Sequence, residues 1–154
     1  MYKRQPAGPS SYELLYRSGA GLTPRPLRRI ASGGELSRVM LASKVVLGNA
    51  DGVDTLVFDE VDAGVGGSTA RALAGVLADL AATHQVIVVT HLAQVAVMAD
   101  KHYVVSKEPG DVPQTHLDEV TGEARTAEIA RMLSGDQSEA SLAHARQMLE
   151  EARG

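Results

Sequence analysis

The sequence predicts an α/β fold, with a largely parallel sheet flanked by helices. Two short apolar runs, Thr55–Phe58 and 85–89, are typical of buried parallel strands. A segment with apolar residues at helical spacing lies between them, and helical segments also precede and follow them. Aromatic residues make up only 3% of the 154 residues, so aliphatic side chains must build the core. This alternation of strands and helices is the pattern of α/β domains.

The first third of the chain predicts a lead-in, one short strand, a loop and a long helix. Residues 1–11 are polar and contain Pro and Gly, which predicts a flexible lead-in to a single domain over 12–154. The strand and the loop are expected at 12–16 and 19–26. The helix is expected to begin after Ser32, and its apolar residues recur at helical spacing: Leu36, Val39, Met40 and Leu47.

The remaining elements complete the α/β pattern. Ser68 follows a glycine-rich turn and is expected to cap the helix that separates the two apolar strands. A short helix is expected at 92–99, after the second strand. A hairpin then follows, with strands expected at 103–105 and 115–120. Two terminal helices are expected at 126–133 and 139–152, the last one capped by Ser138.

Composition excludes several classes of protein. The chain contains no cysteine, which excludes disulfides and cysteine zinc sites and favours a reducing cytoplasm. No apolar run approaches membrane-spanning length. The net charge of −4 does not indicate nucleic-acid binding, yet the first 38 residues carry an excess of basic side chains. That excess fits either a solvated stretch or a patch that faces the phosphates of a nucleotide or of DNA.

Polar residues follow both apolar strands, where active groups of α/β sheets are found. Asp59 and Glu60 come directly after the first strand. One carboxylate of such a pair can hold a hydrated Mg²⁺ while the other orients an attacking water, as phosphoryl transfer requires. The alternative is a surface acidic pair that caps the next turn.

His91 follows the second strand and is preceded by Thr90. It is therefore expected to reach across the strand ends toward the phosphate on which Glu60 acts. There, an imidazole can donate a hydrogen bond to the γ-phosphate. The other histidines have no comparable setting and are interpreted as surface or edge residues: His84, His102, His116 and His144.

Two glycine-rich segments precede helices. Residues 32–35, Ser-Gly-Gly-Glu, place free backbone N–H groups and a hydroxyl at a helix start, which suits an anion. The alternative is a capping box, since Ser32 and Glu35 have that spacing. Residues 64–67 lack the lysine of a phosphate-binding loop, and no G-x-x-x-x-G-K-S/T pattern occurs in the chain.

The order and spacing of these motifs resemble those of the SMC-like ABC ATPases, a family that maintains DNA. Residues 30–38, IASGGELSR, resemble the ABC signature motif; transporter ATPases usually carry Gln where this chain has Glu35. Residues 55–60 resemble a Walker B strand with its catalytic glutamate, 62–67 the D-loop, and 90–91 the switch motif. The resemblance covers nearly the whole chain and implies the C-terminal half of a P-loop NTPase head.

The resemblance implies a role for each motif. Asp59 would hold Mg²⁺ through water, Glu60 would polarise the attacking water, and His91 would contact the γ-phosphate of ATP. The signature residues would bind the ATP of an opposing head: Ser32, Gly33, Gly34 and Glu35. The D-loop residues would lie along the dimer interface: Asp62, Gly64, Gly66 and Gly67. Many ABC proteins have an aspartate where this chain has Gly66. The resemblance therefore implies no role for an acidic side chain in the D-loop of this chain.

The resemblance also implies partners. The family holds its P-loop in an N-terminal lobe, separated by a long coiled coil, and this chain contains neither the P-loop motif nor sustained heptads. We therefore expect one part of a longer cytoplasmic, nucleoid-associated protein that uses ATP and Mg²⁺ in recombinational double-strand-break repair. Its expected partners are the N-terminal lobe, a second head and DNA, with no membrane, and the chain alone is expected to be inactive. The alternatives are another SMC-like or ABC head, and a non-catalytic module that binds DNA or a partner through Arg25, Arg28 and Arg29.

Overall fold

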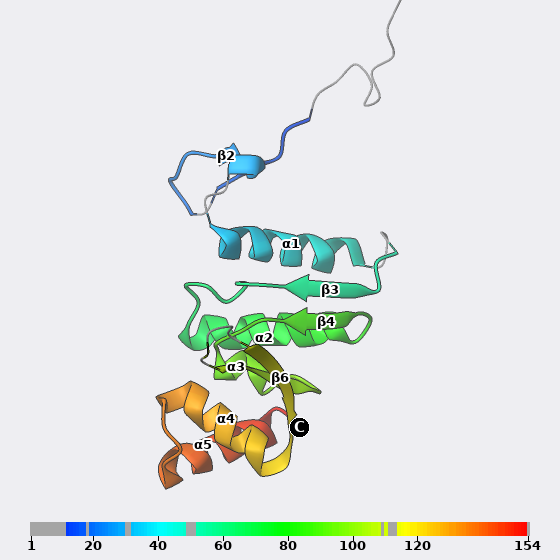
Figure 1. The fold of residues 1–154 in the computed structure, drawn as a ribbon. Helices are drawn as coiled ribbons and strands as arrows, with labels where there is room; N and C mark the ends of the chain where they lie inside the picture. Colours follow the sequence, from blue (N-terminus) through cyan, green and yellow to red (C-terminus); the bar gives the residue numbers. More distant parts are fainter. Residues whose placement is uncertain are drawn as a thin grey trace, which may run out of the picture.

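The chain folds as an α/β structure whose elements are stacked roughly in chain order, from β2 to α5 (Figure 1). The computed structural model describes residues 12–17, 19–29, 32–48, 52–108, 110 and 114–153. The predicted lead-in lies outside the described residues. The elements are β1 (Leu15–Tyr16), β2 (Arg25–Pro26), η1 (Leu27–Arg29), α1 (Gly33–Leu47), β3 (Thr55–Phe58), α2 (Gly67–Ala81), β4 (Gln85–Val88), α3 (Ala93–Ala96), β5 (His102–Glu108), β6 (Gln114–Val120), α4 (Gly122–Ser134) and α5 (Glu139–Glu151).

The predicted parallel pairing is confirmed for the two apolar strands. β3 and β4 pair in parallel, with Thr55 opposite Gln85 and Phe58 opposite Val88, and α2 forms the crossover between them. In the described part of the chain, the other pairs, β1 with β2 and β5 with β6, are antiparallel. The parallel sheet is thus limited to two strands, because no further described strand lies alongside them.

One face of the β3–β4 pair packs on α2. Leu56 and Phe58 alternate inward from β3 and join a buried cluster with Leu73 and Leu77 of α2. The residues that alternate with them face the other way, and their apolar side chains are exposed: Val57 at 65%, Ile87 at 47% and Val89 at 58%. Parallel strands are normally covered on both faces. This sheet therefore has an uncovered apolar face in the described chain.

A second core lies among α3, α4 and α5. Ile129 of α4 is fully buried and packs with residues of α3 and α5, including Ala93 and Ala145. Arg125 ties α4 to the end of α3, because its Nη2 donates to the carbonyl oxygens of Ala96, Val97 and Ala99. Among the described helices, none is long and apolar enough to cross a membrane.

Two predicted details of the helices can be checked against the structure. The cap of α5 is confirmed, because the hydroxyl of Ser138 accepts a hydrogen bond from the backbone N–H of Ser141. The cap predicted for α2 at Ser68 is wrong. Gly66 occupies the N-cap position in an extended conformation and the helix begins at Gly67, so Ser68 already lies inside the first turn.

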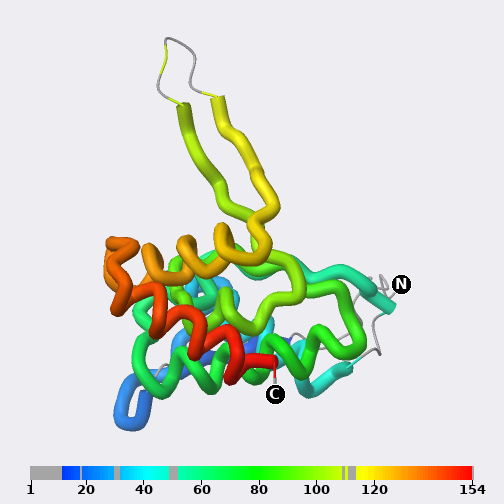
Figure 2. Tube along the Cα trace, turned by 90° about the horizontal axis from the view of Figure 1, so that it is seen from below, coloured from blue at the N-terminus to red at the C-terminus, as the bar shows by residue number. Residues whose placement is uncertain are grey.

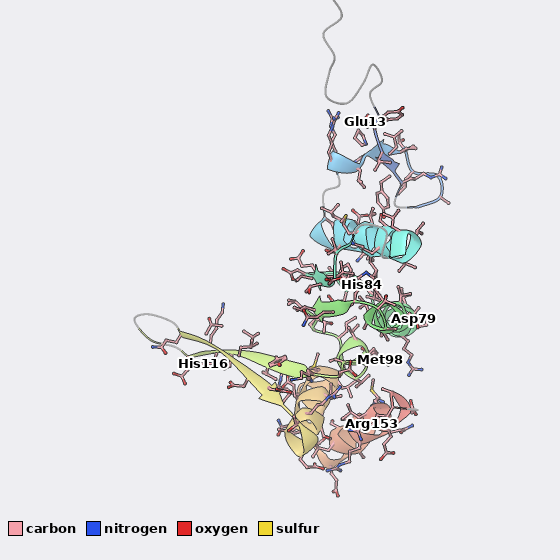
Figure 3. All side chains as sticks on the ribbon, turned by 90° about the vertical axis from the view of Figure 1, so that its right-hand side faces the viewer. Glu13, Asp79, His84, Met98, His116 and Arg153 are labelled. Atoms are coloured by element: carbon pink, nitrogen blue, oxygen red, sulfur yellow. The ribbon has the colours of Figure 1, made fainter. Side chains whose placement is uncertain are left out.

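The hairpin of β5 and β6 projects from the rest of the molecule (Figure 2). It is longer than predicted, with seven residues in each strand paired from His102 opposite Val120 to Glu108 opposite Gln114. In Figure 3, His116 lies on this projecting arm, away from the helices. The longer pairing shows that strand pairing overrides the weak local signal at the ends of the hairpin.

Candidate functional site

The ends of β3 and β4 form a common rim. Because the two strands are parallel, the residues that follow Phe58 and Val88 emerge at the same edge of the sheet. The backbone N–H of Val89 also donates to the carbonyl oxygen of Phe58 at 2.9 Å, so the pairing continues past the last strand residues. The structure thus brings the candidate residues Asp59, Glu60 and His91 to one edge, as the sequence predicted.

The rim side chains are accessible. Asp59 and Glu60 are exposed, and the His91 side chain is 72% exposed. The described residues contain no cluster of three or more side chains suited to holding a metal. Mg²⁺ is commonly bound through one or two carboxylates together with waters and substrate phosphates. The exposed carboxylate of Asp59 has the donor chemistry that such a site uses.

The buried carboxylate of Asp62 joins the loop after β3 to the loop after β4. Asp62 is only 2% exposed, and its Oδ2 accepts hydrogen bonds from Thr90 Oγ1 at 2.5 Å and from the backbone N–H of His91 at 3.1 Å. His91 Nδ1 lies 3.2 Å from the same oxygen. The sequence interpretation placed Asp62 in the interface loop, but it did not predict this contact, which links residues 29 positions apart.

The helix α1 is tied to the loop that carries the acid pair. Ser37 Oγ donates to the carbonyl oxygen of Asp59 at 2.6 Å. Arg38 Nη1 donates to the carbonyl oxygens of Val61 at 3.2 Å and Ala63 at 2.9 Å. Ser37 and Arg38 lie inside the segment that resembles the signature motif, yet sequence reasoning assigned no role to either. The sequence pattern gives no signal for them, because the apolar residues that mark this helix, Leu36, Met40 and Leu47, are exposed in the structure.

The two glycines at the start of α1 allow Glu60 to lie close to the helix. A Cβ on Gly33 would be 2.5 Å from Glu60 Oε2. A Cβ on Gly34 would be 2.7 Å from the carbonyl oxygen of Glu60 and 2.8 Å from Ala63 Cβ. At Gly34 the contact is with the backbone of Glu60, so glycine is required there for a steric reason, whereas at Gly33 only the end of the flexible Glu60 side chain would have to move.

Glu60 has a backbone conformation that is uncommon for a residue with a side chain. Its φ is 56°, in the left-handed region. The turn is closed by the backbone N–H of Ala63, which donates to the carbonyl oxygen of Glu60 at 3.0 Å. Strained residues of this kind persist only where their surroundings hold them, and they cluster at functional sites. Here the bonds from α1 to the same loop supply that support.

Ser32 caps α1. Its hydroxyl accepts a hydrogen bond from the backbone N–H of Glu35 at 3.1 Å, which confirms the capping interpretation of this serine. Capping does not exclude anion binding, because the other N–H groups of a first helical turn have no partner within the helix. Gly33 and Ser32 are exposed, so this helix start is open to a ligand or to a second chain.

The glycine-rich loop at 64–67 is exposed and open. Gly64 and Gly67 have φ values of 72° and 55°, which a side chain would strain, and a Cβ there would meet nothing within 4 Å. These glycines are thus required for the shape of the turn and not for a close contact within the described chain. Gly66 is likewise free of neighbours.

Other candidates lie away from the rim. Arg25 belongs to β2, while Arg28 and Arg29 belong to η1; all three are exposed, and Arg28 forms an ion pair with Glu13 at 2.7 Å. The sequence predicts His84 to be a surface or edge residue; it lies directly before β4, but it is not on the surface. It is 8% exposed because the connection between α2 and β4 packs it inside, and its Nε2 has no hydrogen-bond partner among the described residues.

Sequence comparison relates the chain to DNA repair proteins. It is 52% identical over 146 residues to the DNA repair protein RecN of Treponema pallidum, covering 94% of this chain and 26% of that protein. The RecN proteins of Deinococcus radiodurans and Streptomyces coelicolor are 53% and 49% identical, over 92% and 96% of this chain. The chain spans about a quarter of the length of the relatives it matches.

No family model matches the chain. A solved structure described in terms of ATP-driven dimerization and DNA-stimulated activation of SMC ATPases aligns with a TM-score of 0.48 and 21% identity, over 88% of this chain and 69% of that one.

Proposed function

This chain is a RecN-type sequence that spans about a quarter of its relatives, and from that premise we propose that it forms the C-terminal lobe of an ATP-hydrolysing head. One observation carries the proposal. The exposed Asp59, Glu60 and His91 stand together where two parallel strands end, and they follow those strands in the order of Walker B and switch motifs.

The rim residues divide the chemistry of phosphoryl transfer. Glu60 orients the attacking water and accepts a proton from it, while His91 donates a hydrogen bond to the γ-phosphate. Asp59 would hold Mg²⁺ through water, and this ion would supply neutralisation of the negative charge on the phosphates. Catalysis of this kind depends mainly on positioning, which fits a loop held in place by hydrogen bonds from α1 and from the strand ends.

A second head completes each site. In this arrangement the exposed start of α1, residues 32–35, contacts the γ-phosphate of ATP held by the opposing head. The open glycine turn at 64–67 lies along the interface between the heads. A Cβ added at Gly64, Gly66 or Gly67 would meet nothing within 4 Å in the described chain, which leaves room there for the partner's surface.

A further lobe of the same protein covers the sheet. Val57, Ile87 and Val89 form an exposed apolar face on strands that need cover on both sides. The chain also contains no P-loop motif. A lobe that corresponds to part of the relatives outside the matched quarter can supply both the cover and the phosphate-binding loop, and we expect the 154-residue chain alone not to hydrolyse ATP.

The proposed biological role is recombinational repair of double-strand breaks in the cytoplasm, at the nucleoid. The relatives are named DNA repair proteins, which supports this role. ATP binding closes two heads, and hydrolysis opens them and changes their grip on DNA.

The substitution Glu60→Gln in the complete protein tests the proposal. The variant is expected to bind ATP but to hydrolyse it far more slowly, so ATP-bound dimers accumulate on size-exclusion chromatography. Glu150→Gln, an exposed position on α5, is the matched control and is expected to behave as the wild type. Wild-type turnover by Glu60→Gln would contradict the assignment.

A second candidate is a non-catalytic module that binds DNA through β2 and η1. It is favoured by the exposure of Arg25, Arg28 and Arg29 on adjacent elements. In that case the chain alone would bind DNA with an affinity that falls steeply with salt. Neutralising the three arginines would abolish this DNA binding. ATP would not change the affinity for DNA.

A further inference from the structure

Asp62 has a buried carboxylate that faces three donor groups of the other loop. All three contacts, to Thr90 Oγ1, to the backbone N–H of His91 and to His91 Nδ1, use the same oxygen, Oδ2. The Asp62 side chain is 3% exposed, whereas that of His91 is 72% exposed. A carboxylate in such a buried position needs donors to compensate for lost hydration. Both loops are therefore joined at one charged atom.

A further contact determines which group donates and which accepts in these hydrogen bonds. The backbone N–H of Leu92 donates to Thr90 Oγ1 at 3.0 Å. The hydroxyl thus accepts from Leu92 and has its own hydrogen available for Asp62, which must accept. An ionised carboxylate can only accept. The remaining contact is favourable only when His91 Nδ1 carries a hydrogen.

We propose that Asp62 is a positioning residue that fixes His91 in the Nδ1–H tautomer and leaves Nε2 to face the rim. The same short loop carries Glu60, two residues before Asp62, and Arg38 holds the carbonyl groups of the two residues that flank Asp62. Asp62 therefore sets the place of His91 relative to Glu60.

The functional part of this inference rests on the proposed ATPase role. In that role, Nδ1 is taken up by Asp62 and Nε2 is the ring nitrogen that meets the γ-phosphate, so the donation proposed above requires the nucleotide-bound imidazole to carry a hydrogen on Nε2 as well as on Nδ1. A displacement of the glycine-rich turn that follows Asp62 would move the carboxylate and with it the imidazole. A second head that contacts this turn would thus change the position of the His91 imidazole through Asp62.

The tautomer can be measured on the 154-residue chain without nucleotide. Two-bond ¹H–¹⁵N correlation spectra of a ¹⁵N-histidine-labelled sample, recorded where the imidazoles are neutral, are expected to show His91 with its hydrogen on Nδ1. His144, exposed on α5, is the internal control and is expected to be unchanged in every variant. A wild-type His91 with its hydrogen on Nε2 would overturn the proposal, whatever the variants do.

Two variants separate positioning from a merely structural contact. Asp62→Ala removes the acceptor, so His91 is expected to change to the Nε2–H tautomer. Asp62→Asn can keep an oxygen at the position of Oδ2, so the Nδ1–H tautomer is expected to be retained. An unchanged His91 tautomer in folded Asp62→Ala would also overturn the proposal.

A kinetic measurement distinguishes this inference from the proposed function. In the complete protein, Asp62→Ala is expected to lower kcat by roughly 10- to 100-fold, the usual effect of losing an outer-shell partner, with KM for ATP nearly unchanged. Asp62→Asn is expected to recover most of kcat. If the tautomer result holds while Glu60→Gln turns over like the wild type, the proposed function fails and the positioning by Asp62 stands.

Discussion

The guanidinium of Arg38 and the carbonyl oxygen of Ala63 are joined by a 2.9 Å hydrogen bond that connects α1 to the loop carrying the acid pair. The same nitrogen also donates to the carbonyl oxygen of Val61. One side chain thus holds both neighbours of Asp62, and the start of α1 and the rim form a single unit. In the proposed head, α1 contacts the nucleotide of the opposing head, and Glu60 acts on the nucleotide of its own head. This unit therefore links the two nucleotide sites.

Removing the Arg38 side chain is expected to loosen this unit. Arg38→Ala leaves two partly buried carbonyl groups without their charged donor, which should lower the free energy of unfolding by about 1–3 kcal/mol. Arg38→Lys should lower the free energy of unfolding by less, since lysine keeps a donor group and the positive charge. Urea unfolding of the chain measures both, with Arg71→Ala, at an exposed position on α2, as the control that should be nearly neutral. An equal loss in the control would show that the effect does not come from the loop.

The glycines of two helices allow a matched steric test. Gly34→Ala places a Cβ 2.7 Å from the carbonyl oxygen of Glu60, so the backbone must move and thermal stability should fall. Gly75→Ala in α2 meets nothing within 4 Å and should raise the stability by up to about 1 kcal/mol, because alanine favours the helix. Thermal unfolding should therefore shift in opposite directions for the two variants. A rise in melting temperature with Gly34→Ala would contradict the close approach of α1 to Glu60.

The second core should be sensitive to the loss of one side chain. Ile129 is 0% exposed among helices α3, α4 and α5. Ile129→Ala is expected to lower the free energy of unfolding by about 2–5 kcal/mol, since it leaves a cavity as well as losing apolar contact. Val46→Ala on α1, where the side chain is 85% exposed, is the control and should be close to neutral in urea unfolding. Similar values for both variants would contradict the packing of this core.

Asp136 predicts a dependence of stability on acid. Hydrogen bonds from the Ser141 hydroxyl first, and then from the backbone and hydroxyl of Ser138, lower the pKa of Asp136 to about 2 from its ordinary value of 3.8. Because the folded pKa is the lower one, the contribution to stability is complete above about pH 4 and is lost as the pH falls through about 2. Asp136→Asn and Ser141→Ala should each flatten the melting temperature between pH 4 and 2. A profile unchanged in both variants would refute this contribution.

Local sequence signals predicted the elements that carry the rim. The apolar run Thr55–Phe58 and the helical spacing after Ser32 were enough to place β3 and α1, because strand and helix periodicity arise from residues close in sequence. The parallel pairing also followed from the α/β alternation, and it brought the acid pair and His91 to one edge. The extent of the hairpin and the cap of α2 were predicted less well, since both depend on backbone hydrogen bonds and turn geometry that the side-chain pattern does not encode.

The sequence by itself predicted which residues are candidates for chemistry, and it determined in what order they follow their strands. Only the tertiary structure decided that Asp62 turns inward to His91, that Arg38 holds the loop that carries Asp62, and that Glu60 takes a left-handed conformation. The physical reason is distance along the chain. These contacts join residues more than 20 positions apart, and their geometry is set when α1, β3 and β4 pack together, which no local pattern of residues specifies.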